Sequence, residues 1–267
     1  MAVNTPPEGC AERPVRGDCC GSPGQDFPGG HPAALVEADR HYIVPWGSRE
    51  VGLAFAAAAA LCAGIVFLAV RFSPLWALLL APVGLLEAFF VLFFRNPTRE
   101  VPGDPGLLVS PADGTVWDIA RVEEKEFVGG PCVRIGIFLS IFDVHVNRAP
   151  ARGRVEWVVH REGAFHDARS KAAARENEST WIGLVRDDEG GPSGVRLLVK
   201  QISGAIARRI VCPLEPPVAV ARGGLVGMIK YGSRTELYIP ADSGVEVRVT
   251  VGEKVKGGLS IVAAWTR

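Results

Sequence analysis

KYGSRTELYIP, residues 230–240, joins a Gly-Ser step to a run of alternating side chains. The run from Thr235 to Ile239 alternates in the way that is typical of a strand. A serine that follows a glycine at the entrance of a strand is ordinary turn chemistry. On this simplest interpretation, the stretch is a turn and a strand of a β-rich domain.

The Gly232–Ser233 peptide bond also has a chemical interpretation. The Ser233 hydroxyl can attack the Gly232 carbonyl, so that the chain passes from an amide to an ester. Elimination and hydrolysis would then leave a ketone, a pyruvoyl group, at the new N-terminus. Glycine suits the donor side because it lacks a Cβ and tolerates strained angles and close approach. The motif alone favours the plain turn, and other parts of the chain favour cleavage.

Composition excludes several classes of function. The 267 residues carry 29 basic and 29 acidic side chains, so no basic excess indicates a nucleic-acid partner. A mean hydropathy of +0.20 is high for a soluble protein and indicates that part of the chain lies in lipid. The six cysteines lack paired CxxC spacing, which argues against a zinc site, and without a secretory signal they do not indicate a disulfide framework. We expect no metal, and reactive thiols at most for Cys19-Cys20.

The N-terminal part of the chain has two segments. Residues 1–35 are rich in proline, glycine and small polar residues, and we predict a disordered tail. Residues 36–100 hold two apolar runs, at about 51–70 and 75–94. Each run is long enough to cross a hydrocarbon core of ~30 Å as a helix. A break of four residues between them predicts a membrane-associated helical hairpin.

The arginines around the hairpin predict its orientation. Four flank its outer ends and one lies in its loop: Arg40, Arg49, Arg95, Arg99 and, in the loop, Arg71. The positive-inside rule then places residues 1–50 and 95–267 on the cytoplasmic side of the cell membrane. Pro82 and Glu87 interrupt the second run, so a hairpin that enters only one leaflet is an alternative. A further alternative is a pair of buried core helices in a soluble domain.

Residues 101–267 change to short strands separated by Gly, Pro or Asp clusters. Helix is sparse, with one candidate at 168–176, and no GxGxxG or Walker motif is present. We therefore predict a mainly β (α+β) domain. Its expected strands are 107–110, 115–122, 133–139, 154–159, 180–186, 195–201, 206–211, 235–239, 245–251 and 260–265.

Two further stretches of this domain carry polar groups suited to chemistry. SPADGT, residues 110–115, holds Asp113, although Asp-Gly between apolar runs is also a strong signal for a plain hairpin turn. FLSIFDVHVNRAP, residues 138–150, holds His145 between two valines in a strand-like run. Alternation would place His145 on one face with Asp143 and Asn147, and alone it is more often a structural histidine.

Together, Asp113, His145 and Ser233 offer a carboxylate, an imidazole and a hydroxyl. These are the groups of a base-activated nucleophile that is oriented by an acid. Such triads occur on unrelated folds in several chain orders, and the order here is Asp, His, Ser. The sequence does not show whether the three groups meet in space.

The same motifs resemble a known family. PADG, FLSIFDVHVNRAP, QISGAIARRI (residues 201–210) and YGSR are similar to the motifs of phosphatidylserine decarboxylases in their shorter form. FFRNPTR, residues 93–99, resembles the stretch that follows the membrane hairpin in that family. Each motif alone is weak, but their combination in the family's order is specific. Only the first ~35 residues are unmatched.

The resemblance implies a pyruvoyl-dependent carboxy-lyase that is made as a proenzyme. Cleavage between Gly232 and Ser233 would give a membrane-attached β chain, residues 1–232, and an α chain, residues 233–267, that starts with the pyruvoyl group. The pyruvoyl ketone would form a Schiff base with phosphatidylserine, accept the electron pair as CO2 leaves, and release phosphatidylethanolamine. His145 would be the general base of cleavage and the acid that reprotonates Cα, and Asp113 the orienting carboxylate.

Two departures from the family pattern affect these roles. Longer members carry a second histidine three residues after the first, where this chain has Arg148. His160 and His166 are weaker substitutes, since both lie in a polar stretch that is typical of a surface. Arg148 is a candidate to bind the substrate phosphate or carboxylate. The Gly-Ser-Arg form of the cleavage step also differs from the more common Gly-Ser-Thr, which we interpret as a subtype difference.

Two alternatives stay open at this point. One is a non-enzymatic β module tethered to the membrane. PADGTV also resembles turns of lipoyl- and biotin-type barrels. However, the lysine that those carriers modify is missing from the turn. That alternative predicts a single intact chain. The other is a pyruvoyl-dependent decarboxylase for another serine-headed lipid, which only substrate assays would distinguish.

Overall fold

The structure is a computed structural model that describes most of the chain after the N-terminal tail. Its described residues are 38–104, 106–170, 172–187, 192–205, 209–230 and 233–265. The features that lie outside them are the predicted tail 1–35 with Cys19-Cys20, residues 206–208 of one predicted strand, and Gly232. Ser233, on the other side of the predicted cleavage bond, is described.

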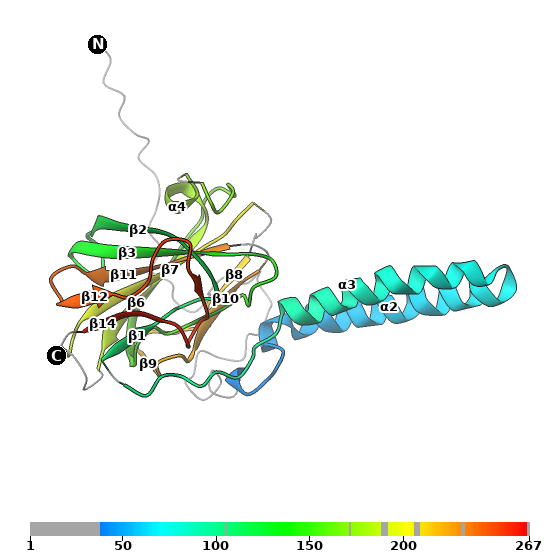
Figure 1. Ribbon diagram of the computed structural model, residues 1–267, viewed down its shortest axis with the longest axis horizontal. Coiled ribbons are helices and arrows are strands. Elements are labelled where there is room, and N and C mark those ends of the chain that lie inside the picture. Colours follow the sequence, from blue (N-terminus) through cyan, green and yellow to red (C-terminus); the bar gives the residue numbers. More distant parts are fainter. Residues whose placement is uncertain are drawn as a thin grey trace, which may run out of the picture.

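Two apolar helices project from a β-rich body (Figure 1). They are α2 (Pro45–Arg71) and α3 (Leu80–Phe93), joined through the 3₁₀ helix η1 (Pro74–Leu79). Both are long and apolar enough to cross a membrane by length and composition, and almost none of their apolar residues is buried. The predicted hairpin is therefore present, and the exposure of its helices does not fit a pair of core helices.

Pro82 is accommodated at the start of the second helix. It lies in the first turn of α3, where backbone N–H groups have no intrahelical partner, so that the N–H missing from proline costs little. The preceding 3₁₀ helix covers the region that the apolar run had predicted as continuous α-helix. The proline therefore moves the start of α3 to Leu80 and leaves the hairpin intact.

The body consists of antiparallel sheets. Within the described residues, the largest sheet has eight strands in the order β13-β2-β3-β11-β7-β6-β5-β9, and two three-stranded sheets have the orders β1-β14-β12 and β4-β10-β8. The strands are β1 (Leu107–Val109), β2 (Gly114–Glu124), β3 (Gly130–Leu139), β4 (Val146–Arg148), β5 (Gly153–Arg161), β6 (Ser179–Arg186), β7 (Arg196–Ile202), β8 (Arg209–Val211), β9 (Val218–Val220), β10 (Leu225–Lys230), β11 (Ser233–Pro240), β12 (Val245–Val247), β13 (Lys254–Val255) and β14 (Ile261–Trp265). The mainly β class is confirmed.

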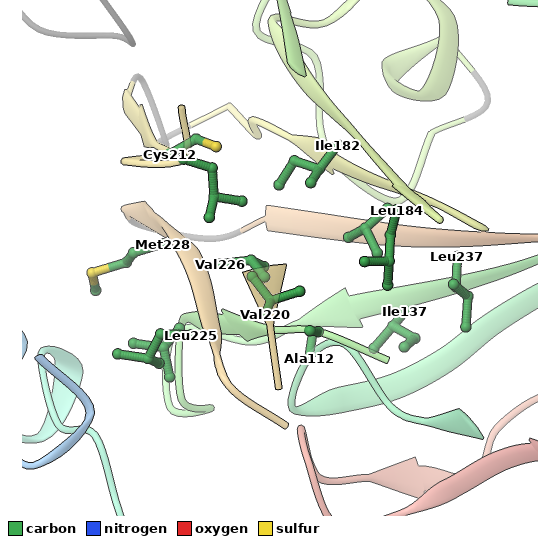
Figure 2. Close-up of a cluster of buried hydrophobic side chains, with 14 of the residues drawn as sticks. Ala112, Ile137, Ile182, Leu184, Cys212, Val220, Leu225, Val226, Met228 and Leu237 are labelled. Carbon is green, nitrogen blue, oxygen red and sulfur yellow. The ribbon is translucent and has the colours of Figure 1, made fainter. Parts of the chain in front are cut away.

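The main core lies between the large sheet and the small sheets. Figure 2 shows that the side chains of Ile137, Leu237 and Leu184 from the large sheet lie in one buried cluster. Val226 of β10 and Ala112 belong to the same cluster. Tyr238, the neighbour of Leu237 on β11, belongs to a separate cluster on the other face. Because side chains alternate along a strand, Ser233 and Thr235 share the inner face with Leu237.

Several local expectations were wrong. The Asp113-Gly114 step is not a hairpin turn, because β1 pairs with β14, whereas β2 pairs with β3 and β13. Gly114 has φ +150°, and a Cβ there would lie 2.2 Å from the carbonyl oxygen of Phe138. The step is thus fixed by close approach of two backbones rather than by a turn type.

The predicted helix 168–176 is shorter than expected. Within the described residues of this range, 168–170 and 172–176, the helix is α4 (Ala173–Glu176). Before it, Asp167 accepts a hydrogen bond from the backbone N–H of Arg169, and the Ser170 hydroxyl accepts one from Ala173. These local side-chain bonds compete with helix formation in the residues that precede α4.

Candidate active site

Ser233 opens β11, the strand at the middle of the large sheet. It pairs with Leu139 at the end of β3, and its side chain is fully buried. Among the described residues, its hydroxyl oxygen has no hydrogen-bond partner. A buried hydroxyl without a partner is costly in a folded protein. Since the Ser233 hydroxyl, unpaired within the described parts of the chain, does not stabilise the fold, its position is consistent with a role in a reaction.

His145 lies directly before β4 and is also fully buried. Its Nδ1 lies 2.9 Å from the carbonyl oxygen of Asp143, and its own carbonyl accepts a hydrogen bond from the N–H of Ile229, four residues before Ser233. Since a carbonyl can only accept, Nδ1 carries the proton and Nε2 is the basic nitrogen of the neutral ring. The contact with Asp143 therefore fixes the tautomer of the imidazole.

The surroundings of His145 keep the ring neutral. The ring of Phe93, at the end of α3, packs on the imidazole with 4.3 Å between ring centroids. Burial lowers the pKa of His145 from 6.5 to about 4, the hydrogen bond to Asp143 opposes this, and the positive charge of Arg95 adds to the lowering. At neutral pH the side chain is therefore an unprotonated base. Asp143 lies in a turn and contacts the ring through its carbonyl, whereas alternation predicted that it would share a strand face with His145.

Asp113 is held by other partners. Arg99 donates to both carboxylate oxygens at 2.8 and 3.1 Å, and the N–H of Gly257 donates to Oδ1 at 2.7 Å. Burial raises the pKa of Asp113 above its usual value, and Arg99 opposes the rise. The carboxylate thus anchors the segment after the hairpin and the turn before β14.

A buried polar network connects the strands around Ser233. Asn147 Nδ2 donates to Thr235 Oγ1 at 2.9 Å, and Gln201 Nε2 donates to Asn147 Oδ1 at 2.8 Å. The three residues come from β4, β11 and β7 and are all buried. Gly227 leaves the space for the amide, since a Cβ there would lie 2.8 Å from Gln201 Nε2. The network fixes the register of β11 two residues after Ser233.

Thr235→Val tests this network. Valine keeps the shape of threonine but leaves Asn147 Nδ2 with only the Pro111 carbonyl at 3.5 Å among its described acceptors. We expect a loss of about 1–3 kcal/mol in the free energy of unfolding. Unfolding is measured in the uncleaved Ser233→Ala background. Thr250→Val, at an exposed hydroxyl, is the control and should change stability by less than about 0.5 kcal/mol. Equal effects would show that the network contributes nothing.

Arg148 lies in the core rather than at an open surface. Its guanidinium donates to Gly223 O at 2.7 Å and Asn96 Oδ1 at 2.5 Å, and it forms an ion pair with Asp39 at 3.0 Å. These bonds join β4 to the segments on both sides of the hairpin. A substrate anion at Arg148 would have to replace one of these oxygens, and its predicted substrate role stays a prediction.

A second contact ties the hairpin to β10. Lys230 Nζ donates to the carbonyl of Trp46 at 2.9 Å and forms an ion pair with Glu50, both in the first turns of α2. The same ammonium lies 5.6 Å from the ring centroid of Phe94. Lys230 is three residues before Ser233. The base of the hairpin therefore packs against the strand that leads to the serine.

Arg234, which follows the serine, faces the other side of the sheet. It forms ion pairs with Asp118 and Glu236, each at 2.8 Å, and Tyr238 donates to Glu236 at 2.7 Å. Gly136 leaves room for Arg234, since a Cβ there would lie 2.6 Å from its Nη2. The arginine of the Gly-Ser-Arg sequence therefore makes its contacts on the outer face of the sheet and not on the inner face, where Ser233 lies.

A hollow of about 800 Å³ lies over this outer face. Its lining includes Trp181, Lys200 and Arg161. Since Ser233 faces the core on the other side of β11, the hollow is not the space into which the hydroxyl points. His160 bonds to Thr180 on β6, and His166 lies 3.2 Å from Glu176 at the surface. His160 therefore contacts β6, and His166 contacts the end of α4.

Sequence reasoning missed Phe93, Arg99 and Gln201. The motifs FFRNPTR and QISGAIARRI contain all three. A glutamine that alternation places on the same strand face as Leu197 and Val199 is a signal for a buried polar contact. Within the parts of the chain that the structure describes, no cluster of three or more His, Cys, Asp or Glu residues is arranged to hold a metal ion.

Comparisons with known proteins agree with the motifs. A family model described as phosphatidylserine decarboxylase matches residues 86–263. The chain is 48% identical over 180 residues to the phosphatidylserine decarboxylase proenzyme of Carboxydothermus hydrogenoformans, a match that covers 67% of this chain and 81% of that protein. It is 43% identical over 187 residues to the proenzyme of Symbiobacterium thermophilum, covering 70% and 83%.

A third relative extends the match further along the chain. The phosphatidylserine decarboxylase proenzyme of Oleidesulfovibrio alaskensis is 39% identical over 227 residues, which cover 84% of this chain and 94% of that protein. The family match includes Asp113, His145 and Ser233 within its bounds. The chain therefore belongs to the phosphatidylserine decarboxylase family.

Proposed function

We propose that this protein is a phosphatidylserine decarboxylase that cleaves itself at Gly232–Ser233 and works with a pyruvoyl group formed from Ser233. The observation that carries the proposal is the Ser233 hydroxyl, which is buried and has no hydrogen-bond partner among the described residues. Family membership supports the reaction, since the relatives are named phosphatidylserine decarboxylase proenzymes. The word proenzyme in those names fits a chain that is processed.

Self-cleavage is assigned to the chain's own residues. His145 Nε2 takes the proton of the Ser233 hydroxyl, and the oxygen attacks the Gly232 carbonyl carbon. The C–N bond breaks as the C–O bond forms, which gives an ester and a free amine on residue 233. Loss of the Cα proton then expels the Gly232 carboxylate, and water replaces the nitrogen, which leaves as ammonia. The products are a chain ending at Gly232 and a chain that begins with a ketone.

The residues around Ser233 fit a pyruvoyl group. Its oxygen atoms can take hydrogen bonds in a site that already holds polar groups of Thr235, Asn147 and Gln201 nearby on the inner face. When present, the pyruvoyl ketone supplies an electron sink for a carboxylate lost from an amino acid headgroup. His145 holds the basic nitrogen that can return a proton to the substrate carbon. Asp113, through Arg99, is assigned a positioning role.

Cleavage would not release the α chain. Residue 233 begins β11, which pairs with β3 over eight residues and with β7 over five. The backbone pairing with β3 and β7 holds β11 along both of its edges. This pairing does not depend on the peptide bond that is broken. We therefore propose a two-chain enzyme of residues 1–232 and 233–267 that stays assembled through its central sheet.

The hairpin is assigned to the membrane that holds the substrate. A lipid with two acyl chains leaves a bilayer at a cost of ~0.8 kcal/mol per exposed CH2, so an enzyme for its headgroup works best at the interface. The helices α2 and α3 supply apolar surfaces of sufficient length. The arginine distribution supports a catalytic domain on the cytoplasmic side of the cell membrane.

The activity is tested with purified protein and vesicles that contain carboxyl-labelled phosphatidylserine. We expect release of labelled CO2 and formation of phosphatidylethanolamine by the wild-type protein, and no release above background by Ser233→Ala, since alanine has no hydroxyl to give a ketone. Equal release by both proteins would contradict the assignment of Ser233. A second assay with other serine-headed lipids decides between the two substrate classes.

A further inference from the structure

We propose that the loop of residues 140–143 is a second membrane contact, whose tip residues Ile141 and Phe142 enter the lipid interface beside the hairpin. The inference rests on the proposed function, because it concerns how the enzyme meets a lipid substrate. The partner is the bilayer surface itself. The consequence is that the loop sets the depth at which the buried site around His145 lies relative to the lipid headgroups.

The loop holds its apolar tip outward. Asp143 N–H donates to Ser140 O at 2.8 Å, and the Asp143 carboxylate accepts from Ser140 N–H at 2.8 Å. These two bonds close the turn on itself. Phe142 is 73% exposed and Ile141 38% exposed. A closed turn with two large apolar side chains at its tip cannot bury them against the body, and exposed apolar patches of this kind mark interaction sites.

The tip is bound to the point where the hairpin leaves the body. Arg95 follows the end of α3, and its Nη2 donates to the Phe142 carbonyl at 2.8 Å. Its Nη1 donates to the Leu92 carbonyl of the same helix. Figure 1 shows the green loop after β3 at the end of the body from which the hairpin projects. Arginine is suited to this level, since its stem lies along apolar surface while its charge stays in water.

The loop also connects directly to the site. On one side, β3 ends at Leu139, which pairs with Ser233. On the other side, the Asp143 carbonyl holds Nδ1 of His145. The reactive serine and the base are thus attached to the two ends of one short loop. A tip that enters the interface therefore brings both groups to the level of the headgroups, while the substrate's acyl chains stay in the bilayer.

The experiment compares two forms of the same substrate with full-length, self-cleaved enzyme. One is phosphatidylserine diluted in phosphatidylcholine vesicles, and the other is a short-chain phosphatidylserine kept monomeric in solution. For Phe142→Ser we expect the KM for vesicle substrate to rise about ten-fold, as loss of one large interfacial side chain predicts, with kcat and the activity on the monomeric substrate unchanged. Val251→Ser, at a position 61% exposed in a turn beside β2, is the matched control and should match wild type in both assays.

A second measurement reports the position of the tip without relying on activity. Tryptophan placed at the tip, Phe142→Trp, should show more fluorescence quenching by brominated lipids than wild type, and Val251→Trp should show no added quenching. Absence of added quenching for Phe142→Trp would overturn the proposal even if the protein proved to be no decarboxylase. An equal loss on both substrate forms would also overturn it, because the loop would then act on His145. A change in oligomeric state in Phe142→Ser would assign the tip to a second copy of the chain instead.

Discussion

His145→Gln is expected to leave the chain uncut between Gly232 and Ser233. Glutamine keeps a donor that can reach the Asp143 carbonyl but has no basic nitrogen, so the Ser233 hydroxyl loses its proton acceptor. Loss of a general base lowers rates by about 100- to 10,000-fold. Cell-free synthesis into lipid nanodiscs, followed by gel analysis over time, measures the cleavage rate. His160→Gln, at a half-buried histidine bonded to Thr180, is the control and should cleave as wild type does.

The pH dependence of cleavage gives the same hypothesis a second test. Because burial lowers the pKa of His145 to about 4, the ring stays neutral and basic down to that pH. When freshly made precursor is shifted to a series of pH values, the cleavage rate should therefore be constant from pH 8 to 5. Near pH 4 it should fall to about half of that constant rate. A midpoint near 6.5 would indicate a solvated histidine or another base. Cleavage of His145→Gln at the wild-type rate would remove His145 from the mechanism.

Phe93→Ala is expected to have the largest effect on stability. The ring is fully buried at the end of α3, packs on His145 at 4.3 Å, and contacts the ring of Phe94 at 5.1 Å between centroids. Truncation of a buried phenylalanine costs about 3–5 kcal/mol, because contacts are lost and a cavity remains. In the Ser233→Ala background, the midpoint temperature of thermal unfolding in detergent should fall by about 6–20 °C for a chain of this size.

The control for Phe93 is a phenylalanine of the same hairpin that faces outward. Phe67 on α2 is exposed, so Phe67→Ala removes contact with lipid or detergent and leaves no cavity in the body. We expect little change in the unfolding of the β-rich body. Phe93→Ala should also raise the pKa of His145 towards 6.5, because water reaches the imidazole. A Phe93→Ala protein with wild-type stability would show that the hairpin base does not support the site.

The pKa of His145 is also linked to stability. The folded state lowers this pKa and so favours the neutral ring. The resulting contribution to the free energy of unfolding is fully present above pH 6.5 and is lost as pH falls towards 4. The fall from 6.5 to about 4 corresponds to about 3 kcal/mol. The buried imidazole therefore makes the fold sensitive to acid, because below pH 6.5 the unfolded chain takes up a proton on His145 that the folded protein does not.

Much of the fold follows from local patterns. The apolar runs, the break at residues 71–74 and the alternating strands predicted the hairpin and the β-rich body. β10 was missed because all six of its residues are buried, so LVGMIK shows no alternation of apolar and polar side chains. β4 and β13 are three and two residues long, which is too short for a periodic signal. These strands form because longer neighbours position them.

The sequence predicts residue types for the candidate site but not the contacts between them. Ser233, His145 and Asp113 stand out as nucleophile, base and acid in the sequence. Nothing in the sequence indicates that a carbonyl of Asp143 orients His145, or that Arg99 takes the carboxylate of Asp113. The contact between Phe93 and His145 joins the apolar helix α3 to the candidate site across 52 positions of the chain, and only the folded structure brings them together.

Intact-mass measurement of the full-length protein purified from membranes, beside Ser233→Ala, tests self-processing most directly. We expect two chains for the wild type, residues 1–232 and 233–267, the smaller lighter by the mass of ammonia than a chain starting with serine. We expect one chain of 267 residues for Ser233→Ala. A single uncut wild-type chain, in a folded preparation inserted in lipid, would contradict the pyruvoyl mechanism and favour a tethered β module without catalytic activity.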